Sequence, residues 1–404
     1  MGSIWQDSIP LELLSEIFKH LPRRDLYCCY QVCQKWKRAV DNAELWSKFV
    51  IYVDRDFVEK TTSTLTNHFF RHIRSLQFGW HTPLVHNRWL PLRVHDLTKK
   101  VVHYIFFLTE NNVQINSFKL FDWYELYPFR KIIYHLSRFL KYQTKLRTLI
   151  FHNLVLPKSE CVKILDSSIG FDNALTYFEV HNYFYNFNTV FDSEIFLKYL
   201  RRLRCLKKLK LDYFILSRND VIDIIVESEV QQKTLELLEI IIDDTDIHSA
   251  VIPSVKWRKF KKLCSYVHLS FVIKNICHYE QLEFIFMMGE LPLKSFSLMC
   301  GSKYNQTKSR NLRLTLSKMI EKYYKTLEYV SLDLRNNKEN LESTLLRIIY
   351  QCVKLKRLVF DGIVNENMQL FYEICVYGET ARGLSVKILP HKYKSLMNIV
   401  HIYG

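Results

Sequence analysis

The sequence predicts an α/β fold, a solenoid of repeated strand-and-helix units preceded by a small all-helical module. Three observations predict it. An apolar pattern of the form L-x-x-L-x-L recurs at near-regular spacing along most of the chain. The segments between these patterns carry apolar residues at helical spacing. The first part of the chain, by contrast, shows short helical patterns separated by breakers.

The first helix of this module is predicted to begin near Pro10. Proline suits a first helical position because its missing N–H is not needed there, and Glu12 places negative charge beside the positive helix end. Its apolar stripe consists of Leu13, Leu14, Ile17, Phe18 and Leu21. This stripe is wider than one small core requires, so part of it must face another body.

Two more short helices follow. Pro22 ends the first helix, residues 26–32 form the second, and residues 33–40 form a third with Trp36 on its apolar side. Fewer than 50 residues cannot bury all of these apolar side chains alone.

The residues that carry a family resemblance are Trp5, Ile9, Pro10, Glu12, Leu13, Leu14, Ile17, Phe18, Leu21, Asp25, Leu26, Val32, Cys33, Trp36, Leu45 and Trp46. In type and spacing this run resembles an F-box, in the form found in F-box proteins with leucine-rich repeats. The resemblance covers about a tenth of the chain. It implies docking to a Skp-type adaptor, which is itself bound to a cullin scaffold. The residues that would face or support the adaptor are Pro10, Leu14, Ile17, Phe18, Leu21, Leu26 and Val32. The alternative is that the module merely caps the next domain.

Twelve strands are predicted from the repeated pattern. Their apolar triplets are 46/49/51, 73/76/78, 115/118/120, 146/149/151, 175/178/180, 206/209/211, 235/238/240, 264/267/269, 293/296/298, 327/330/332, 355/358/360 and 383/386/388. Most successive triplets start 27 to 34 residues apart, and one interval of 42 contains an insertion at residues 79–92. That insertion, with Trp80, His81, His86 and Trp89, either touches a target or packs over the solenoid edge.

Helices are predicted between the strands, at residues 193–203, 220–230, 312–324, 341–352 and 366–376 among others. A repeat with one strand and one helix stacks into a leucine-rich repeat solenoid, a horseshoe with a parallel inner sheet and outer helices. The predicted domains are therefore an F-box at residues 3–48 and a leucine-rich repeat domain at residues 49–404. Because no linker separates them, we expect the module to pack directly on the first repeat.

Composition excludes several classes of protein. No signal peptide precedes the module and no apolar run is long enough to span a bilayer, which predicts an intracellular protein, cytoplasmic or nuclear. The ten cysteines show no C-x-x-C spacing, so neither a disulfide framework nor a zinc site is expected. His68 and His72 have helical metal-ligand spacing but no third ligand. We expect no metal, no cofactor and no catalytic residues, because nucleophile and phosphate-binding motifs are absent.

The net charge of +16 is concentrated beyond residue 50. One cluster contains Arg201, Arg202, Arg204, Lys207, Lys208 and Lys210, and a second lies at residues 256–262. Both fall near expected helix C-termini, where cations offset the negative end of the helix dipole. The same cations would also suit an acidic or phosphorylated segment of a target.

Target contacts are expected from strand residues that point away from the helices. Together with the basic clusters, these give the candidate substrate-binding residues Lys208, Lys210, Tyr177, His268, Tyr266, Arg357, Arg201 and Arg204. Residues Leu209 and Leu211 should instead be buried. The leading hypothesis is a non-enzymatic substrate-recognition subunit of an SCF-type ubiquitin ligase. The alternatives are an F-box protein that acts as a non-ligase scaffold and a basic repeat protein that binds nucleic acid.

Overall fold

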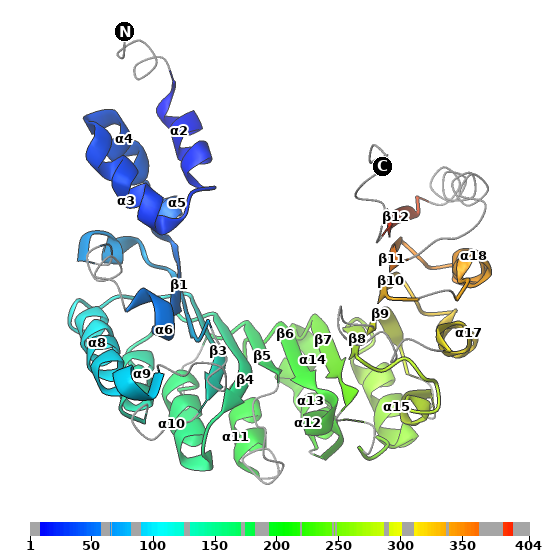
Figure 1. Cartoon of the computed structure of the whole chain (residues 1–404). Helices are drawn as coiled ribbons and strands as arrows, with labels where there is room; N and C mark the ends of the chain where they lie inside the picture. The colour runs from blue at the N-terminus through cyan, green and yellow to red at the C-terminus, as the bar shows by residue number, and fades with distance from the viewer. Residues whose placement is uncertain are drawn as a thin grey trace. The chain divides into compact units, whose positions relative to one another are not determined.

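The computed structural model describes residues 9–57, 65, 67–81, 90–124, 130–170, 174–181, 194–218, 220–244, 246, 249–286, 291–300, 311–336, 339–362 and 383–390 (Figure 1). The chain divides into two compact units, residues 1–190 with 202–205, and residues 191–201 with 206–404. We describe each unit by itself. Among the described residues, no helix combines the length and the apolar character needed to cross a membrane.

The first unit begins with four short helices, α2 (Leu11–Phe18), α3 (Arg23–Val32), α4 (Gln34–Val40) and α5 (Ala43–Trp46). Pro10 and Pro22 stand at the N-caps of α2 and α3, as prolines suit a helix start. Cys33 is extended, with φ −159°, and separates α3 from α4. The three predicted helices are confirmed, and α5 is an addition. Trp5 lies outside the described residues.

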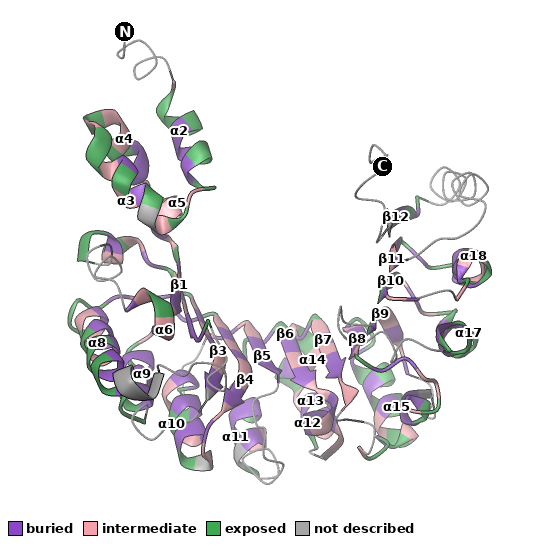
Figure 2. Ribbon diagram, viewed as in Figure 1, coloured by how far each residue is buried: buried purple, intermediate pink, exposed green. Residues whose placement is uncertain are grey.

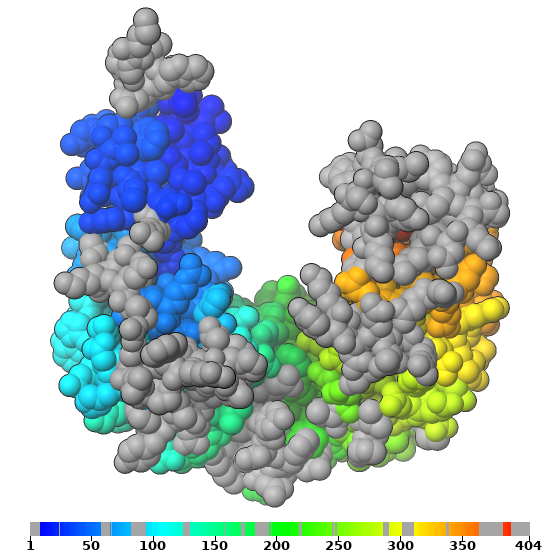
Figure 3. Space-filling view, in the orientation of Figure 1, coloured from blue at the N-terminus to red at the C-terminus, as the bar shows by residue number. Residues whose placement is uncertain are grey.

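The helical module packs directly on the strand that follows it. The rings of Trp46 and Phe69 stack with their centroids 3.9 Å apart. The Arg23 guanidinium lies 4.6 Å from the centroid of the Phe49 ring and donates a hydrogen bond to the carbonyl of Val50. The Arg23 contacts join α3 to the first strand, and the Trp46–Phe69 stack joins α5 to the segment before the second strand. These contacts confirm the expectation of direct packing without a linker. In the space-filling view the module forms one continuous blue group (Figure 3).

The sheet of the first unit has strands β1 (Lys48–Tyr52), β2 (Ser75–Gly79), β3 (Ser117–Tyr124), β4 (Thr148–Val155) and β5 (Tyr177–His181). Each pairs in parallel with the next in sequence order. The helices among them are α6 (Val53–Asp56), η1 (Phe70–His72), α8 (Leu90–Glu110), α9 (Arg130–Lys141) and α10 (Lys158–Ser168).

The sheet of the second unit has strands β6 (Lys208–Asp212), β7 (Leu237–Ile242), β8 (His268–Lys274), β9 (Leu293–Cys300), β10 (Tyr329–Leu334), β11 (Arg357–Gly362) and β12 (Ser385–Pro390). They too are parallel and follow sequence order. The helices are α11 (Glu194–Arg202), α12 (Tyr213–Arg218), α13 (Val221–Glu227), α14 (Glu229–Thr234), α15 (Ser254–Leu263), α16 (Glu283–Phe286), α17 (Leu312–Tyr323) and α18 (Glu342–Gln351).

Alternation along each strand decides what is buried. In β6, Leu209 and Leu211 are fully buried while Lys208 is exposed and Lys210 is half-buried, as the sequence predicts. Figure 2 shows the strands and the sheet-facing sides of the helices as the buried core of each unit. A strand is found at each of the twelve predicted positions, and parallel strands alternate with helices, which is consistent with a solenoid.

The predicted register of the eighth strand is wrong. Leu269 pairs with Leu238, so the inward residues are Leu269, Phe271 and Ile273, two residues later than the predicted triplet. An irregularity between Leu269 and Ser270 then absorbs the change of phase against β9. Tyr266 consequently lies before β8 rather than within it.

The single helix predicted at residues 220–230 is two helices, α13 and α14, because the Ser228 side chain accepts a hydrogen bond from the backbone N–H of Gln231 and starts a new helix. In the insertion, Trp80 is buried with its ring 5.6 Å from that of Trp123, and α8 begins at Leu90. His86 and Trp89, like the helix predicted at residues 366–376, lie outside the described residues.

Candidate functional site

Helix α2 carries two parallel apolar ridges. Leu14 and Phe18, four residues apart, form the buried ridge, and the Phe18 ring meets the ring of Trp36 edge-on at 5.3 Å. Leu13 and Ile17, also four residues apart, form the second ridge and remain 55% and 51% exposed. Figure 2 shows this division of α2 into a buried and an exposed side. The over-wide stripe predicted from the sequence is therefore real, and its outer ridge is Leu13 and Ile17.

Val32, the last residue of α3, is a further exposed apolar side chain of the module, at 52% exposure. A soluble monomer exposes single apolar residues commonly, but a group of them on one small module marks a contact surface.

The predicted adaptor-facing residues fall into two classes in the structure. Leu14, Phe18 and Leu26 are buried inside the module and Leu21 is half-buried, so they support the surface rather than form it. Pro10, Ile17 and Val32 are exposed. Sequence reasoning left Leu13 out of the candidate set, although its spacing from Ile17 is the signal that identifies it.

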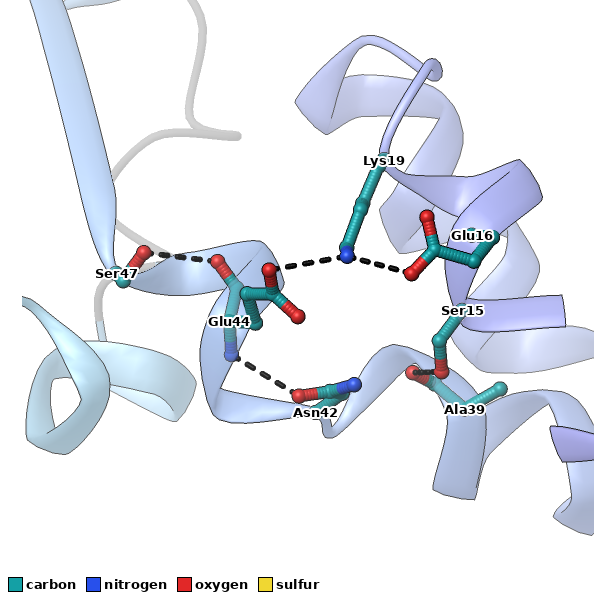
Figure 4. Close-up of polar contacts among 7 residues, drawn as sticks. All are labelled: Ser15, Glu16, Lys19, Ala39, Asn42, Glu44 and Ser47. Atoms are coloured by element: carbon teal, nitrogen blue, oxygen red, sulfur yellow. Dashed lines mark hydrogen bonds and ion pairs between the residues drawn. The ribbon is translucent and has the colours of Figure 1, made fainter. Parts of the chain in front are cut away.

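Polar contacts fix the geometry of this surface (Figure 4). The Lys19 ammonium lies 2.6 Å from a Glu16 carboxylate oxygen and 3.0 Å from one of Glu44, which ties the end of α2 to α5. The hydrogen bonds to Glu16 and Glu44 raise the pKa of Lys19. The Ser15 hydroxyl donates to the carbonyl of Ala39, 3.3 Å away, and joins α2 to α4. The exposed ridge therefore stands on a helix that is anchored at two points.

The second candidate surface is the open face of each sheet, the face that the helices do not cover (Figure 1). In the first unit it carries a hydrogen-bonded chain of side chains on β4 and β5. The Tyr177 hydroxyl donates to one oxygen of the buried Glu179, and the other oxygen lies 2.6 Å from Nε2 of His152. The ring of His181 meets that of His152 at 5.8 Å. The Tyr177 hydroxyl thus already has a hydrogen-bond partner within this group of side chains.

In the second unit several cations of the predicted basic clusters are already paired. Lys210 lies 2.9 Å from Glu239 on the next strand, and Lys207 lies 2.8 Å from Glu236. The hydrogen bond to Lys207 lowers the pKa of Glu236. The second cluster follows the same rule, since Lys256 bridges to carboxylates on the preceding repeat. Lys207, Lys210 and Lys256 are therefore compensated locally by carboxylates of neighbouring repeats.

The open face of β8 to β11 has a different character. His268 Nε2 lies 2.6 Å from the Ser295 hydroxyl, and its ring centroid lies 5.5 Å from that of Tyr329. Arg357 pairs with Tyr329 in the strand register. Burial, and after it the charge of Lys294, lowers the pKa of His268. Aromatic, hydroxyl and cationic side chains meet here on neighbouring strands.

The structure does not bring all the predicted substrate-binding residues together. Tyr177 and Arg204 belong to the first unit, whereas the second unit contains Arg201, Lys208, Lys210, Tyr266, His268 and Arg357. Within the second unit, His268 and Arg357 both lie beside Tyr329, a residue outside the predicted set.

Among the described residues, no group of three or more histidine, cysteine or acidic side chains has the arrangement of a metal site. The described cysteines are free thiols. Burial raises the pKa of the thiols of Cys264 and Cys352 to about 11, which makes them unreactive apolar side chains at neutral pH.

Comparison with protein families gives a match for the helical module and β1. Residues 6–52 match the F-box-like family. This range contains the exposed ridge of α2, Val32 and the contacts that anchor them. F-box domains generally dock on the adaptor of SCF-type ubiquitin ligases, and proteins that contain them are typically non-catalytic substrate receptors. Residues 6–52 of this chain are an F-box-like domain, a match that suggests a Skp-type adaptor as a partner.

Proposed function

We propose that this protein is the substrate-recognition subunit of an SCF-type E3 ubiquitin ligase. The F-box, residues 3–48, docks on a Skp-type adaptor, and a leucine-rich repeat domain, residues 49–404, holds a protein target for ubiquitination. The observation that carries the proposal is the exposed Leu13 and Ile17 ridge on a segment that matches the F-box-like family. The subunit contributes proximity rather than chemistry, because tethering raises the effective concentration of a target lysine near the conjugating enzyme.

The stacked strands provide the surface for a target. Their outward side chains are fixed by the ladder, so the candidate residues are presented on a rigid framework rather than on loops. The candidates on or beside the open faces are Tyr177, Lys208, Lys210, Tyr266, His268 and Arg357, with Arg201 and Arg204 near the end of α11.

The adaptor contact is tested by co-purification of the full chain with its adaptor. We expect Leu13→Asp with Ile17→Asp to weaken adaptor binding at least about a hundredfold, because the interface loses two apolar side chains and acquires two unpaired carboxylates. Phe18 is a poor target for this test, since it is buried and its substitution by Asp would disrupt the module itself.

The matched control is Val255→Asp with Leu263→Asp, which changes two exposed apolar residues of α15 in the same way. This control should bind the adaptor like the wild type, and thermal unfolding should show all variants folded. If the α2 variant retains full adaptor binding, the docking role is wrong. If it loses adaptor binding but the wild-type complex does not support ubiquitination of any captured target, the chain is a scaffold and not a ligase receptor.

A further inference from the structure

We propose that the open face and adjoining edge of β8 to β11 bind an acidic segment of the target protein that also carries an aromatic or aliphatic side chain. We name this surface the β8–β11 patch and define it by Tyr266, His268, Lys294, Ser295, Tyr329 and Arg357. The inference rests on the proposed receptor function and specifies the chemistry of its target.

Exposed aromatic side chains are the first observation. Tyr266 is 49% exposed just before β8, and Tyr329 is 39% exposed at the start of β10. The position of Tyr329 is set by His268, whose ring lies beside it and is itself held by the Ser295 hydroxyl. Tyrosine and arginine with restricted rotamers are the residues that most often dominate protein–protein binding energy. Tyr329 therefore offers a partly fixed apolar surface to a partner side chain.

Uncompensated charge is the second observation. Backbone hydrogen bonds place Glu328 between Lys294 and Lys356. Lys294 is the second residue of β9, and Glu328 and Lys356 directly precede β10 and β11. Lys356 is held by Glu328 at 2.6 Å. The Lys294 ammonium donates a hydrogen bond to the carbonyl of Tyr266, 3.4 Å away, but forms no ion pair with any described residue. Arg357, exposed on β11, also forms none within the part of the chain that the structure describes. Two cations thus remain for a ligand, which favours carboxylates or phosphate.

Other outward positions of β8, β9 and β10 carry small side chains. Ser270, Ser295 and Ser297 occupy β8 and β9, and Ser331 follows on β10. Small side chains allow a polypeptide to approach the sheet closely. Neighbouring strands lie ~4.8 Å apart, so the width from β8 to β11 is ~14 Å. An extended peptide covers that distance with about four residues.

A polypeptide fits this patch better than nucleic acid. Nucleic-acid affinity depends on a series of unpaired cations that follow the phosphates. In the second unit such a series is interrupted, because Lys207, Lys210 and Lys256 are neutralised by carboxylates of neighbouring repeats. Lys294 and Arg357, which have no carboxylate partner among the described residues, lie beside exposed tyrosines and match an acidic segment with an apolar anchor.

The experiment measures binding of a fluorescent random copolymer of glutamate and tyrosine to the full chain purified with its adaptor. Poly-glutamate of equal length and a single-stranded oligothymidine of equal charge serve as comparison probes. We expect the copolymer to bind more tightly than poly-glutamate at about 0.1 M salt and binding to weaken as salt increases. Lys294→Glu with Arg357→Glu should weaken copolymer binding at least tenfold, and Tyr329→Ala about fivefold or more.

The matched control is Arg313→Glu with Lys322→Glu, which makes the same change in net charge on the exposed surface of α17 in the same unit. It should leave copolymer binding within about twofold of the wild type. Equal weakening by the control and the patch variant would overturn the proposal, because net charge alone would then explain binding. Oligothymidine that binds as tightly as the copolymer and competes with it would overturn the choice of a polypeptide.

Adaptor binding, measured on the same preparations, separates this inference from the proposed function. The patch variants should retain the adaptor. The Leu13→Asp, Ile17→Asp variant, purified without the adaptor, should bind the copolymer as tightly as the wild-type chain purified without the adaptor. A wild-type chain without adaptor affinity would defeat the receptor function. A chain that binds the adaptor while its patch variants still bind the copolymer normally would defeat only the assignment of the patch.

Discussion

Asp246 gives the most quantitative prediction about stability. This carboxyl group is 3% exposed and accepts the backbone N–H of Asp243 at 2.9 Å, which closes the turn after β7. Burial, with a further contribution from the negative charge of Asp212, raises its pKa from 3.8 to about 7. Folding therefore favours the protonated form, since the unfolded chain releases this proton near pH 3.8 and the folded chain only near pH 7.

The sign follows from this proton difference. Between about pH 4 and pH 7 the folded state holds more protons than the unfolded state, so the contribution of Asp246 to the free energy of unfolding falls as pH rises and levels off above pH 7. A difference of about 3 pKa units corresponds to about 4 kcal/mol. An asparagine at this position has no charge to desolvate and keeps one acceptor oxygen. Asp246→Asn should therefore gain up to about 4 kcal/mol relative to the wild type between pH 4 and pH 8.

The assay is chemical denaturation of wild type and Asp246→Asn at unit pH steps from 4 to 8. The relevant quantity is the difference between the two proteins at each pH, in which other titrating groups largely cancel. Glu227→Gln, which makes the same change in charge at an exposed carboxyl of α13, is the control. Parallel pH profiles for wild type and Asp246→Asn would refute the reasoning, because the Asp246 carboxyl would then titrate alike in the folded and unfolded chain.

Two further predictions concern β6. Leu209→Ala should lower the free energy of unfolding by ~2 to 5 kcal/mol because it leaves a cavity in the core. Lys210→Ala should lower it by about 1 kcal/mol or less, and chemical denaturation measures both changes. A larger loss of stability for Lys210→Ala than for Leu209→Ala would show that the strand register is wrong. Lys208→Glu with Lys210→Glu should weaken capture of an acidic target, and this effect should decrease as the salt concentration increases. The same double variant should lower the free energy of unfolding by about 1 kcal/mol because a new carboxylate faces Glu239. Capture with unchanged affinity and salt dependence would place the target away from β6.

Strand positions could be predicted because each inward residue is buried by two sets of contacts. Each inward residue of a repeat must meet both the helix of its own repeat and the inward residues of adjacent strands, so the apolar pattern recurs wherever a strand occurs. The failure at β8 follows from the same logic. Val267 and Leu269 are both buried, yet Val267 precedes the strand and Phe271 takes the place that the pattern gives to Leu269. An apolar residue just outside a strand produces the same signal as one inside it.

Which ridge of α2 faces outward could not be predicted in full. Spacing shows that Leu13 pairs with Ile17 and Leu14 with Phe18, but both pairs are equally apolar. Which ridge faces inward depends on Trp36 of α4, because the Phe18 ring packs against the Trp36 ring. Periodicity within one helix therefore groups the side chains into two ridges, and tertiary contacts decide which ridge faces outward.

Basic residues of β6 and the segment before it pair with carboxylates that are distant in the sequence. Along the chain, residues 201–210 contain six cations and no acidic residue, which by itself suggests a polyanion site. The ladder places the residue 29 positions later beside each cation, so Lys207 meets Glu236 and Lys210 meets Glu239. Both carboxylates lie outside the basic run and are found only through the parallel register. Local density of charge is therefore a poor guide to binding in this fold. The informative cations are those, such as Arg357, whose neighbours in the ladder bring no carboxylate.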